Sequence, residues 1–320
     1  VCTVAVAGSP GIRVILDTDA NNELDDQHAI AYLLFNGGTF RVEGITVNRT
    51  RNGGDIEQHV HEARRVVTLC ARDGTIPVYR GADGAFDQVR DHVHDPAFDG
   101  ADAVRFIIER ARLDSARKLV LLPVGKLTNI ALALHKDPSI VSRVRVVWLG
   151  SNYPDPGEYN QDNDIPALNY VLDTGVEFEV ALVRYGKPSG TDAVRASQAE
   201  IRRIMPGLGP HVAVPVEGRN GGAFTNFGEY SADLFTHRGD ASRALFDMAA
   251  VAIVKNPAWA ESRVLPAPTV VDGHWVERPD NPRTIVLWEH FDRASIMGDF
   301  YRSMRAYDLA DGAEKPRGTE

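Results

Sequence analysis

Short apolar runs alternate with amphipathic stretches along most of the chain. Val14 to Leu16 is typical of a buried strand, and Asp26 to Phe35 then spaces its apolar residues as a helix does. The same pattern predicts further strands at 42–47, 76–79, 119–123, 144–149 and 178–183, and further helices at 56–70, 101–113, 128–135 and 197–204. Such alternation indicates parallel βαβ units. We therefore predict an α/β fold with an open, mostly parallel, Rossmann-like sheet flanked by helices.

The pattern weakens after Gly207. Glu217 to Tyr230 is rich in glycine and asparagine, which predicts a loop that is either mobile at an active site or an ordinary surface connection. Beyond it the pattern predicts a helix at 242–255, short strands at 269–271, 275–276 and 284–287, and a helix at 293–306. We expect one α/β domain over 12–309, an N-terminal extension at 1–11 and a frayed tail at 310–320.

Composition and charge narrow the range of functions. The 320 residues are 43% hydrophobic, which suffices for one large core. The 35 Lys and Arg residues against 44 Asp and Glu give a net charge of −9 without any long basic block, so we expect no nucleic-acid polymer as partner. No apolar run approaches the roughly 20 residues that span a bilayer, so we expect a soluble protein without a membrane partner. Val1 to Pro10 is small and apolar, as in the remnant of a trimmed leader, so the compartment, cytoplasmic or exported, stays open.

Four aspartates gather where the first predicted strand gives way to the first predicted helix: Asp17, Asp19, Asp25 and Asp26. In an open parallel sheet, ligands bind outside the carboxyl ends of the strands. Carboxylates crowded at such an edge repel one another unless they are protonated, solvated or neutralised by an ion. Hard cations such as calcium or magnesium prefer this oxygen-rich environment. The alternative is an ordinary acidic helix start, which the helix dipole favours.

The opening segment is similar to that of the inosine–uridine nucleoside hydrolase family, which begins with a strand and D-x-D-P-G-x-D-D. Here five residues, Ala20 to Leu24, separate Asp19 from Asp25, so the turn is two residues longer. The resemblance runs through nearly the whole chain, and it implies cleavage of the N-glycosidic bond of ribonucleosides with a calcium ion. It makes Asp19 the catalytic base and a metal ligand, Asp25 a ribose-binding residue and Asp26 a bidentate calcium ligand. Asp17 would be the supporting carboxylate behind them.

Two later segments extend the resemblance. Val124 to Asn129 follows a predicted strand and resembles the family's G-P-L-T-N turn, which implies that the backbone carbonyl of Val124 binds the metal. A main-chain oxygen serves whatever the side chain is. Leu245 to Ala249 resembles an L-H-D-P-x segment, which makes Asp247 the last metal ligand. The implied calcium site thus consists of Asp19, Asp26, Asp247 and the Val124 carbonyl.

Matches to the sugar-binding segments are looser. Ile45 to Asn48 resembles an I-T-x-x-x-G-N segment, in which either Asn48 or Asn52 supplies an amide, and we favour Asn48. Asn169, followed by Asp173, resembles an E-F-N-x-x-x-D pattern, which places Ala167 where the family has a glutamate. That reading leaves the site without one carboxylate. Three residues of the preceding polar stretch could replace it: Asn160, Asn163 and Asp164.

The group that assists departure of the base is open. Purine-leaning members of the family have a histidine just before the late aspartate, and this chain has Phe246. His237 and Glu229 lie in or near the predicted loop and could bind the substrate there, although a lone loop histidine is more often solvated. Aromatic residues of the same segment could stack on a base or pack against the domain: Phe224, Phe227 and Tyr230.

The sequence thus predicts a calcium-dependent nucleosidase in which Asp19 activates water, with a small nucleoside or related N-glycoside as substrate. The resemblance suggests a homodimer or homotetramer. A haloacid-dehalogenase-type phosphatase is an alternative, because these enzymes also open with a strand and D-x-D, here Asp17 and Asp19. The other alternative is a calcium-dependent sugar- or nucleoside-binding protein that has lost turnover, which Ala167 and Phe246 would favour.

Overall fold

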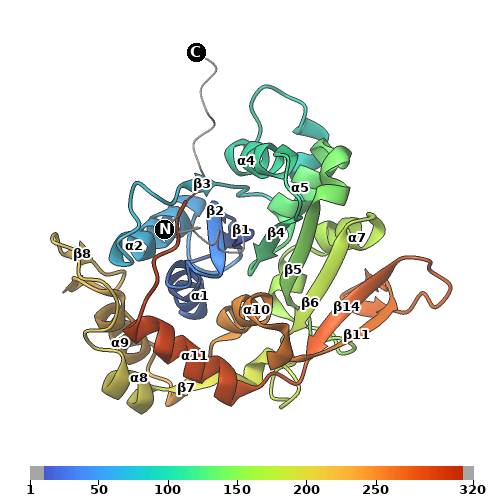
Figure 1. Ribbon diagram of the computed structural model, residues 1–320. Coiled ribbons are helices and arrows are strands. Elements are labelled where there is room, and N and C mark those ends of the chain that lie inside the picture. Colours follow the sequence, from blue (N-terminus) through green and yellow to red (C-terminus); the bar gives the residue numbers. More distant parts are fainter. Residues whose placement is uncertain (1–10, 313–320) are drawn as a thin grey trace, which may run out of the picture.

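The central element of the molecule is an eight-stranded sheet (Figure 1). We use a computed structural model, which describes residues 11–312. The strands of the sheet are β1 (Ile12–Thr18), β2 (Phe40–Val47), β3 (Val78–Arg80), β4 (Leu119–Pro123), β5 (Val144–Gly150), β6 (Glu177–Leu182), β11 (Glu261–Pro266) and β14 (Thr284–Glu289). They lie in the order β11-β14-β6-β5-β4-β1-β2-β3. Only β11 runs antiparallel to its neighbour, so the predicted open, mostly parallel sheet is confirmed.

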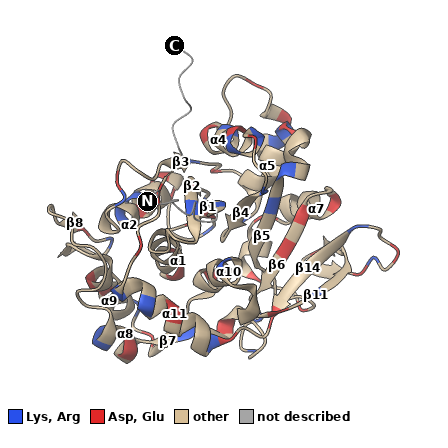
Figure 2. Cartoon of the chain, viewed as in Figure 1, with Lys and Arg blue, Asp and Glu red and all other residues tan. Residues whose placement is uncertain are grey.

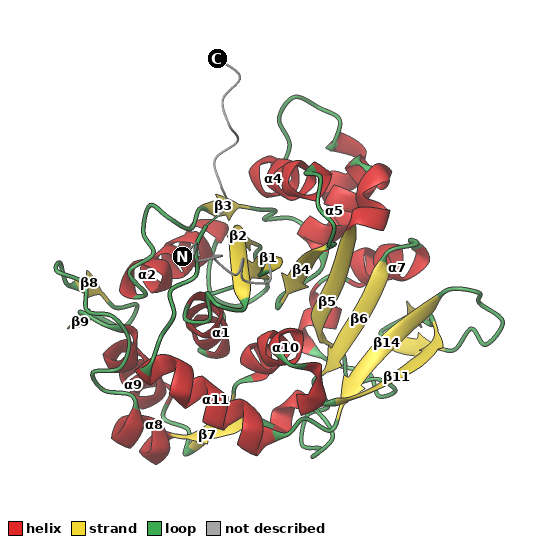
Figure 3. Ribbon diagram, viewed as in Figure 1, coloured by secondary structure: helices red, strands yellow, loops and turns green. Residues whose placement is uncertain are grey.

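Helices cover both faces of the sheet (Figure 3). One face carries α1 (Asp25–Leu34), α2 (Ile56–Leu69), α10 (Phe246–Lys255) and α11 (Arg293–Arg305), and the other carries α3 (Phe86–Val89), α4 (Ala101–Arg112), α5 (Thr128–Lys136) and α7 (Ile165–Asp173). Successive strand residues point to opposite faces. Val14 and Leu16 of β1 accordingly belong to one hydrophobic cluster and Ile15 to the other. The continuous apolar runs of the strands reflect this burial on both faces.

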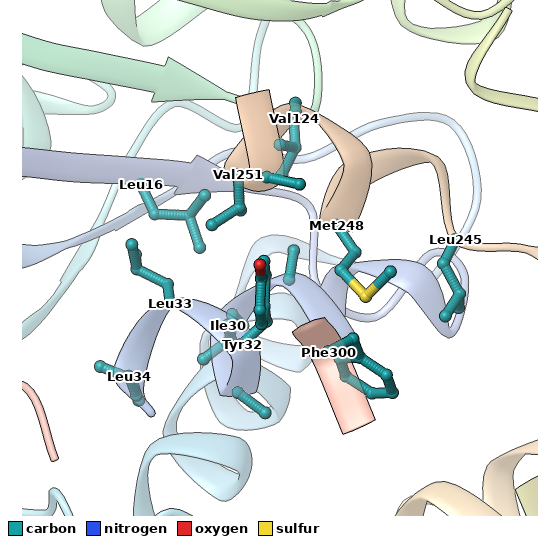
Figure 4. Close-up of a cluster of buried hydrophobic side chains, with 14 of the residues drawn as sticks. Leu16, Ile30, Tyr32, Leu33, Leu34, Val124, Leu245, Met248, Val251 and Phe300 are labelled. Atoms are coloured by element: carbon teal, nitrogen blue, oxygen red, sulfur yellow. The ribbon is translucent and has the colours of Figure 1, made fainter. Parts of the chain in front are cut away.

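The helices α1, α10 and α11 pack together beside the carboxyl end of β1. α1 packs along α10, and Figure 4 shows Leu16 of β1 among side chains of these two helices, including Ile30 and Val251. Phe300 of α11 closes the cluster and is fully buried. Because α1 and α10 are held side by side, their N-terminal turns are placed next to each other.

The remaining elements lie around this frame. They are the helices α6 (Tyr159–Asn163), α8 (Gln198–Ile204) and α9 (Phe227–Arg238), the 3-10 turns η1 (Arg90–His92), η2 (Pro138–Arg143), η3 (Thr191–Ala193) and η4 (Pro257–Trp259), and the paired strands β7 (Arg195–Ser197) with β10 (Ser242–Ala244), β8 (Val216–Glu217) with β9 (Ala223–Phe224), and β12 (Thr269–Val271) with β13 (His274–Val276). β10 and α10 occupy the range predicted as one helix, and α6, α7 and β11 were not predicted.

The structure differs from two sequence predictions about irregular segments, in part of each. The expected loop up to Tyr230 ends earlier, because α9 begins at Phe227, capped by the Asn226 side chain, which accepts from the backbone N–H of Glu229 at 2.9 Å. The expected tail is ordered at its start. Ala310 is buried and its N–H donates to the Leu34 carbonyl at 2.8 Å. The other parts of the predicted extension and tail, 1–10 and 313–320, lie outside the described residues.

Charges of both signs are mixed over the surface elements. Figure 2 shows basic and acidic segments together on α4 and α8. Within residues 11–312, no helix combines the length and the apolar character that crossing a membrane requires.

A buried ion-pair network ties β1, β2 and α4 together. The Glu43 carboxylate has no exposed area, and it accepts from Arg13 Nε and from Arg110 Nε, each at 2.7 Å. Glu43→Gln would leave Arg110 buried without its counter-charge. We expect the free energy of unfolding, measured by urea denaturation, to fall by about 3 kcal/mol. Glu177→Gln, which removes an exposed ion pair with Lys118, should change it by less than about 1 kcal/mol. Equal losses in the two variants would contradict a role of burial.

Candidate active site

A cavity of about 100 Å³ opens at the carboxyl ends of β1, β4, β5 and β6. The chain runs from β1 to β2 on one side, and β4 pairs with β1 on the other, so the strand order reverses at β1. Ligands of open α/β sheets bind at such a point. Five acidic residues in the cavity wall are buried: Asp19, Asp25, Asp26, Glu158 and Asp247.

The tightest acidic group joins two helix starts. Asp25 and Asp26 lie in the first turn of α1, and Asp247 lies in the first turn of α10. One carboxylate oxygen from each lies within 4.8 Å of the others. The two helix N-termini favour negative charge. The Thr18 hydroxyl donates to Asp26 at 2.5 Å and orients it.

Burial makes these carboxylates expensive to ionise. It raises the pKa of Asp25 to about 6 and raises the pKa values of Asp26 and Asp247 well above the usual range. The negative charges of their neighbours, including Asp19, raise the pKa of Asp26 and of Asp247 further. A group of this kind must hold protons or a cation. The donor set, composed of buried carboxylate oxygens, fits a hard cation.

Asp19 follows β1 and stands beside this group. Burial, and secondarily the nearby charge of Asp25, raises the pKa of Asp19 to about 7 despite a hydrogen bond from the Thr50 hydroxyl. A carboxylate with this pKa accepts a proton well near neutral pH. A Cβ on Gly125 would lie 2.7 Å from Asp19 Oδ1, so only glycine lets the turn after β4 come this close.

Asp17 supports the site from behind without lining the cavity. Its carboxylate accepts from Thr46 Oγ1 and Asn48 Nδ2 at 2.6 Å and from Asn129 Nδ2 at 2.7 Å. Burial raises the pKa of Asp17 to about 6, while these donors lower it. Asn129, the last residue of the segment Val124 to Asn129, therefore links α5 to the end of β1 through this hydrogen bond.

Val124 lines the cavity. The Val124 N–H donates to the Asp17 carbonyl at 2.8 Å, which fixes the backbone as it leaves β4. Asn160 Nδ2 donates to the Val124 carbonyl at 2.9 Å. The structure thus places Val124 and Asn160 in the wall of the same cavity as Asp19, Asp25, Asp26 and Asp247, all candidate site residues of the sequence analysis.

Most of the other predicted site residues lie outside the cavity wall. Of the two alternative asparagines, Asn52 lines the cavity, whereas the favoured Asn48 is buried behind it and donates to Asp17. Asp164 caps α7 and accepts from Phe86 N at 2.8 Å, and Asn169 binds the Val270 backbone. Three more lie outside the cavity wall: Asn163, Glu229 and His237, the last two on α9.

Glu158 corrects the prediction that the site lacks a carboxylate. It lines the cavity at the start of α6, and it accepts from the backbone N–H groups of Ser151 at 2.8 Å and Asn160 at 3.0 Å. Burial raises its pKa. Glu158-Tyr159-Asn160 with Asp164 has the same E-aromatic-N-x-x-x-D spacing that the sequence analysis placed around Ala167. That spacing was the signal, and it was assigned nine residues too late.

Comparison with known proteins agrees with this geometry. The model of the family described as inosine-uridine preferring nucleoside hydrolase matches residues 14–300. A probable uridine nucleosidase 2 of Oryza sativa subsp. japonica is 30% identical over 198 residues, 52% of this chain and 55% of that protein. An inosine-uridine preferring nucleoside hydrolase of Leishmania major is 30% identical over 163 residues, 44% of this chain and 49% of that protein. The chain therefore spans about half the length of these curated relatives.

Solved structures show the same fold over a longer range. A plant nucleoside hydrolase aligns with a TM-score of 0.71 and 17% identity, and the alignment covers 93% of this chain and 100% of that protein. A purine-preferring ribonucleoside hydrolase from Gardnerella vaginalis aligns with a TM-score of 0.65 and 22% identity, covering 91% and 98%. The family match over residues 14–300 shows that the phosphatase alternative is wrong. The chain belongs to the inosine-uridine preferring nucleoside hydrolases, a family of N-glycosyl hydrolases.

Proposed function

We propose that this protein hydrolyses the N-glycosidic bond of ribonucleosides, releasing free sugar and free base, with Ca²⁺ as its cofactor. The observation that carries the proposal is the group of buried carboxylates around the cavity at the β1 switch point, in a chain of this family. The presence of Glu158 removes one of the two sequence arguments for a binding protein without turnover, the one based on Ala167.

Asp19, Asp26, Asp247 and the Val124 carbonyl would hold the ion. Their oxygens are hard donors, and the three carboxylates are buried at the cavity. A bound Ca²⁺ would supply positive charge that orients the attacking water and makes it more acidic. Asp25 belongs to the same oxygen group as Asp26 and Asp247, and the family resemblance assigns it to a sugar hydroxyl.

Asp19 accepts the proton of the attacking water, because its buried carboxylate lines the cavity beside the aspartates that would hold the ion. The oxygen of that water forms the new bond to the anomeric carbon while the bond to the base breaks. The transition state resembles an oxocarbenium ion, which neighbouring carboxylates stabilise. Asp25, Glu158 and Asn160 hold the sugar and so orient the reacting carbon.

The test is the release of reducing sugar from inosine, adenosine, uridine and cytidine, with and without a calcium chelator. We expect release that the chelator abolishes and added Ca²⁺ restores. If calcium raises the melting temperature and nucleosides bind without being cleaved, the protein is a binding protein. If neither effect occurs, the proposed metal site is refuted as well.

A further inference from the structure

The wall of the cavity also contains a cation that the mechanism above does not use. Arg243 of β10 lines the cavity beside Tyr185 and Phe246. The rings of Tyr185 and Phe246 meet edge to face with centroids 5.7 Å apart. Phe246 occupies the position where purine-leaning relatives have a histidine, so this wall is where the departing base should lie.

Contacts on two sides hold Arg243 in place. Its Nη2 lies 2.5 Å from Glu23 Oε2, and its Cζ lies 5.3 Å from the centroid of the Phe246 ring. Glu23 belongs to the lengthened turn between Asp19 and Asp25, and it also accepts from Arg238 Nη1 at 3.1 Å. The two extra residues of this turn therefore bring a carboxylate that pins a guanidinium at the cavity.

One donor of Arg243 is unused among residues 11–312. Its Nε is buried and has no hydrogen-bond partner in this part of the chain, while the side chain as a whole is 20% exposed. An unpaired buried N–H costs stability, commonly about 1–3 kcal/mol. A ligand with an acceptor atom at the cavity wall would satisfy it.

Building on the proposed function, we propose that Arg243 binds the departing base and stabilises the negative charge that the base acquires as the glycosidic bond breaks. A guanidinium keeps its proton in proteins, so this residue acts by charge and by N–H donation. Phe246 supplies an apolar surface for the ring of the base. In this proposal Arg243, held by Glu23 of the lengthened turn, compensates for the histidine that Phe246 replaces.

The step balances as follows. The electron pair of the bond between the anomeric carbon and the base nitrogen goes to the base, which departs as an anion facing Arg243. The water oxygen bonds to the anomeric carbon, and its proton goes to Asp19. The base then takes a proton from solvent, and Asp19 releases its proton to solvent, giving neutral sugar and base.

Tyr185 is the competing candidate, because its hydroxyl could donate a proton to the base. Burial raises the pKa of this hydroxyl, which keeps it protonated but makes it a weak acid. Tyr185→Phe removes that proton and leaves the ring. The two residues can therefore be separated by substitution.

The experiment compares two kinds of leaving group in the full chain with Ca²⁺. Inosine and uridine lose a poor leaving group, whereas p-nitrophenyl riboside loses an acidic phenol that departs without help. For Arg243→Gln we expect turnover of inosine and uridine to fall roughly 10²- to 10³-fold, and that of p-nitrophenyl riboside to fall only about threefold. Arg243→Lys, which restores the charge, should recover part of the loss. Arg90→Gln, which removes an exposed ion pair with Asp87 outside the cavity wall, is the matched control and should stay near the wild type.

Each outcome decides one question. If the wild type cleaves neither substrate class, the proposed function fails. If the wild type cleaves both and Arg243→Gln lowers both equally, Arg243 only maintains the structure and the inference is overturned. A selective loss in Tyr185→Phe, with Arg243→Gln unaffected, would assign the leaving group to the tyrosine instead.

Discussion

Asp19→Asn is expected to lower nucleoside turnover roughly 10³-fold while the protein keeps its fold. The amide has the shape of the carboxylate, and its oxygen can still accept from the Thr50 hydroxyl. It cannot accept the proton of the attacking water. The measurement is sugar release from the best nucleoside under saturating Ca²⁺, together with the unfolding temperature.

The matched control is Asp102→Asn, the same chemical change at an exposed position of α4 on the far side of the sheet. It should leave turnover and stability unchanged. Turnover near the wild-type value in Asp19→Asn would show that another group takes the proton. Complete loss of calcium stabilisation in that variant would instead make Asp19 essential as a ligand, beyond its role as base.

The beginning of the site could be predicted because it is local in the sequence. β1, the acidic turn and α1 are contiguous, and the buried strand and helix periods differ clearly. Asp19, Asp25 and Asp26 had to lie at the end of β1 once these elements were recognised. Asp247 is remote in sequence, and only the resemblance of its segment placed it beside them.

The sugar end was harder because the polar stretch after β5 offers several similar residues. Glu158 and Asn160 line the cavity while Asp164 caps α7, and all three are polar residues of one short segment. Composition does not distinguish a cap from a ligand, since both roles use the same side chains. The sequence analysis aligned the pattern on Asn169, whereas the structure favours its alignment on Asn160. It therefore missed Glu158.

α9 escaped prediction because its helix signal is weak. Gly228 and the aromatic residues at its start are poor helix formers, and the buried Phe227 and Tyr230 are stabilised by tertiary packing. The Tyr230 hydroxyl donates to the buried Glu62 of α2 at 2.5 Å. This contact between remote segments could not be inferred from the local sequence pattern. It holds the start of α9, predicted as a loop, against α2. Arg243 gave no sequence signal either, because its role depends on Glu23, far away in the chain.

The second large effect concerns the metal group, where Asp247→Asn should separate stability from calcium binding. Asp25, Asp26 and Asp247 are buried close together in the wild type. Without calcium, in the presence of a chelator, this burial raises their pKa values and disfavours their charged forms. Replacing one carboxylate by a neutral amide relieves this crowding. The variant should therefore unfold in chelator at the same temperature as the wild type or a higher one.

Calcium should reverse this order. A ligand that binds only the folded state at about 100 times its Kd stabilises it by about 2.7 kcal/mol. We expect a stabilisation of this size in the wild type and little in Asp247→Asn, because the amide offers the ion one neutral oxygen in place of a carboxylate. Thermal unfolding in chelator and in millimolar Ca²⁺ measures both quantities, with Asp102→Asn as the control that keeps the full calcium response. Equal calcium stabilisation of the wild type and Asp247→Asn would place the ion away from the joined starts of α1 and α10, and the proposed mechanism would lose its cofactor site.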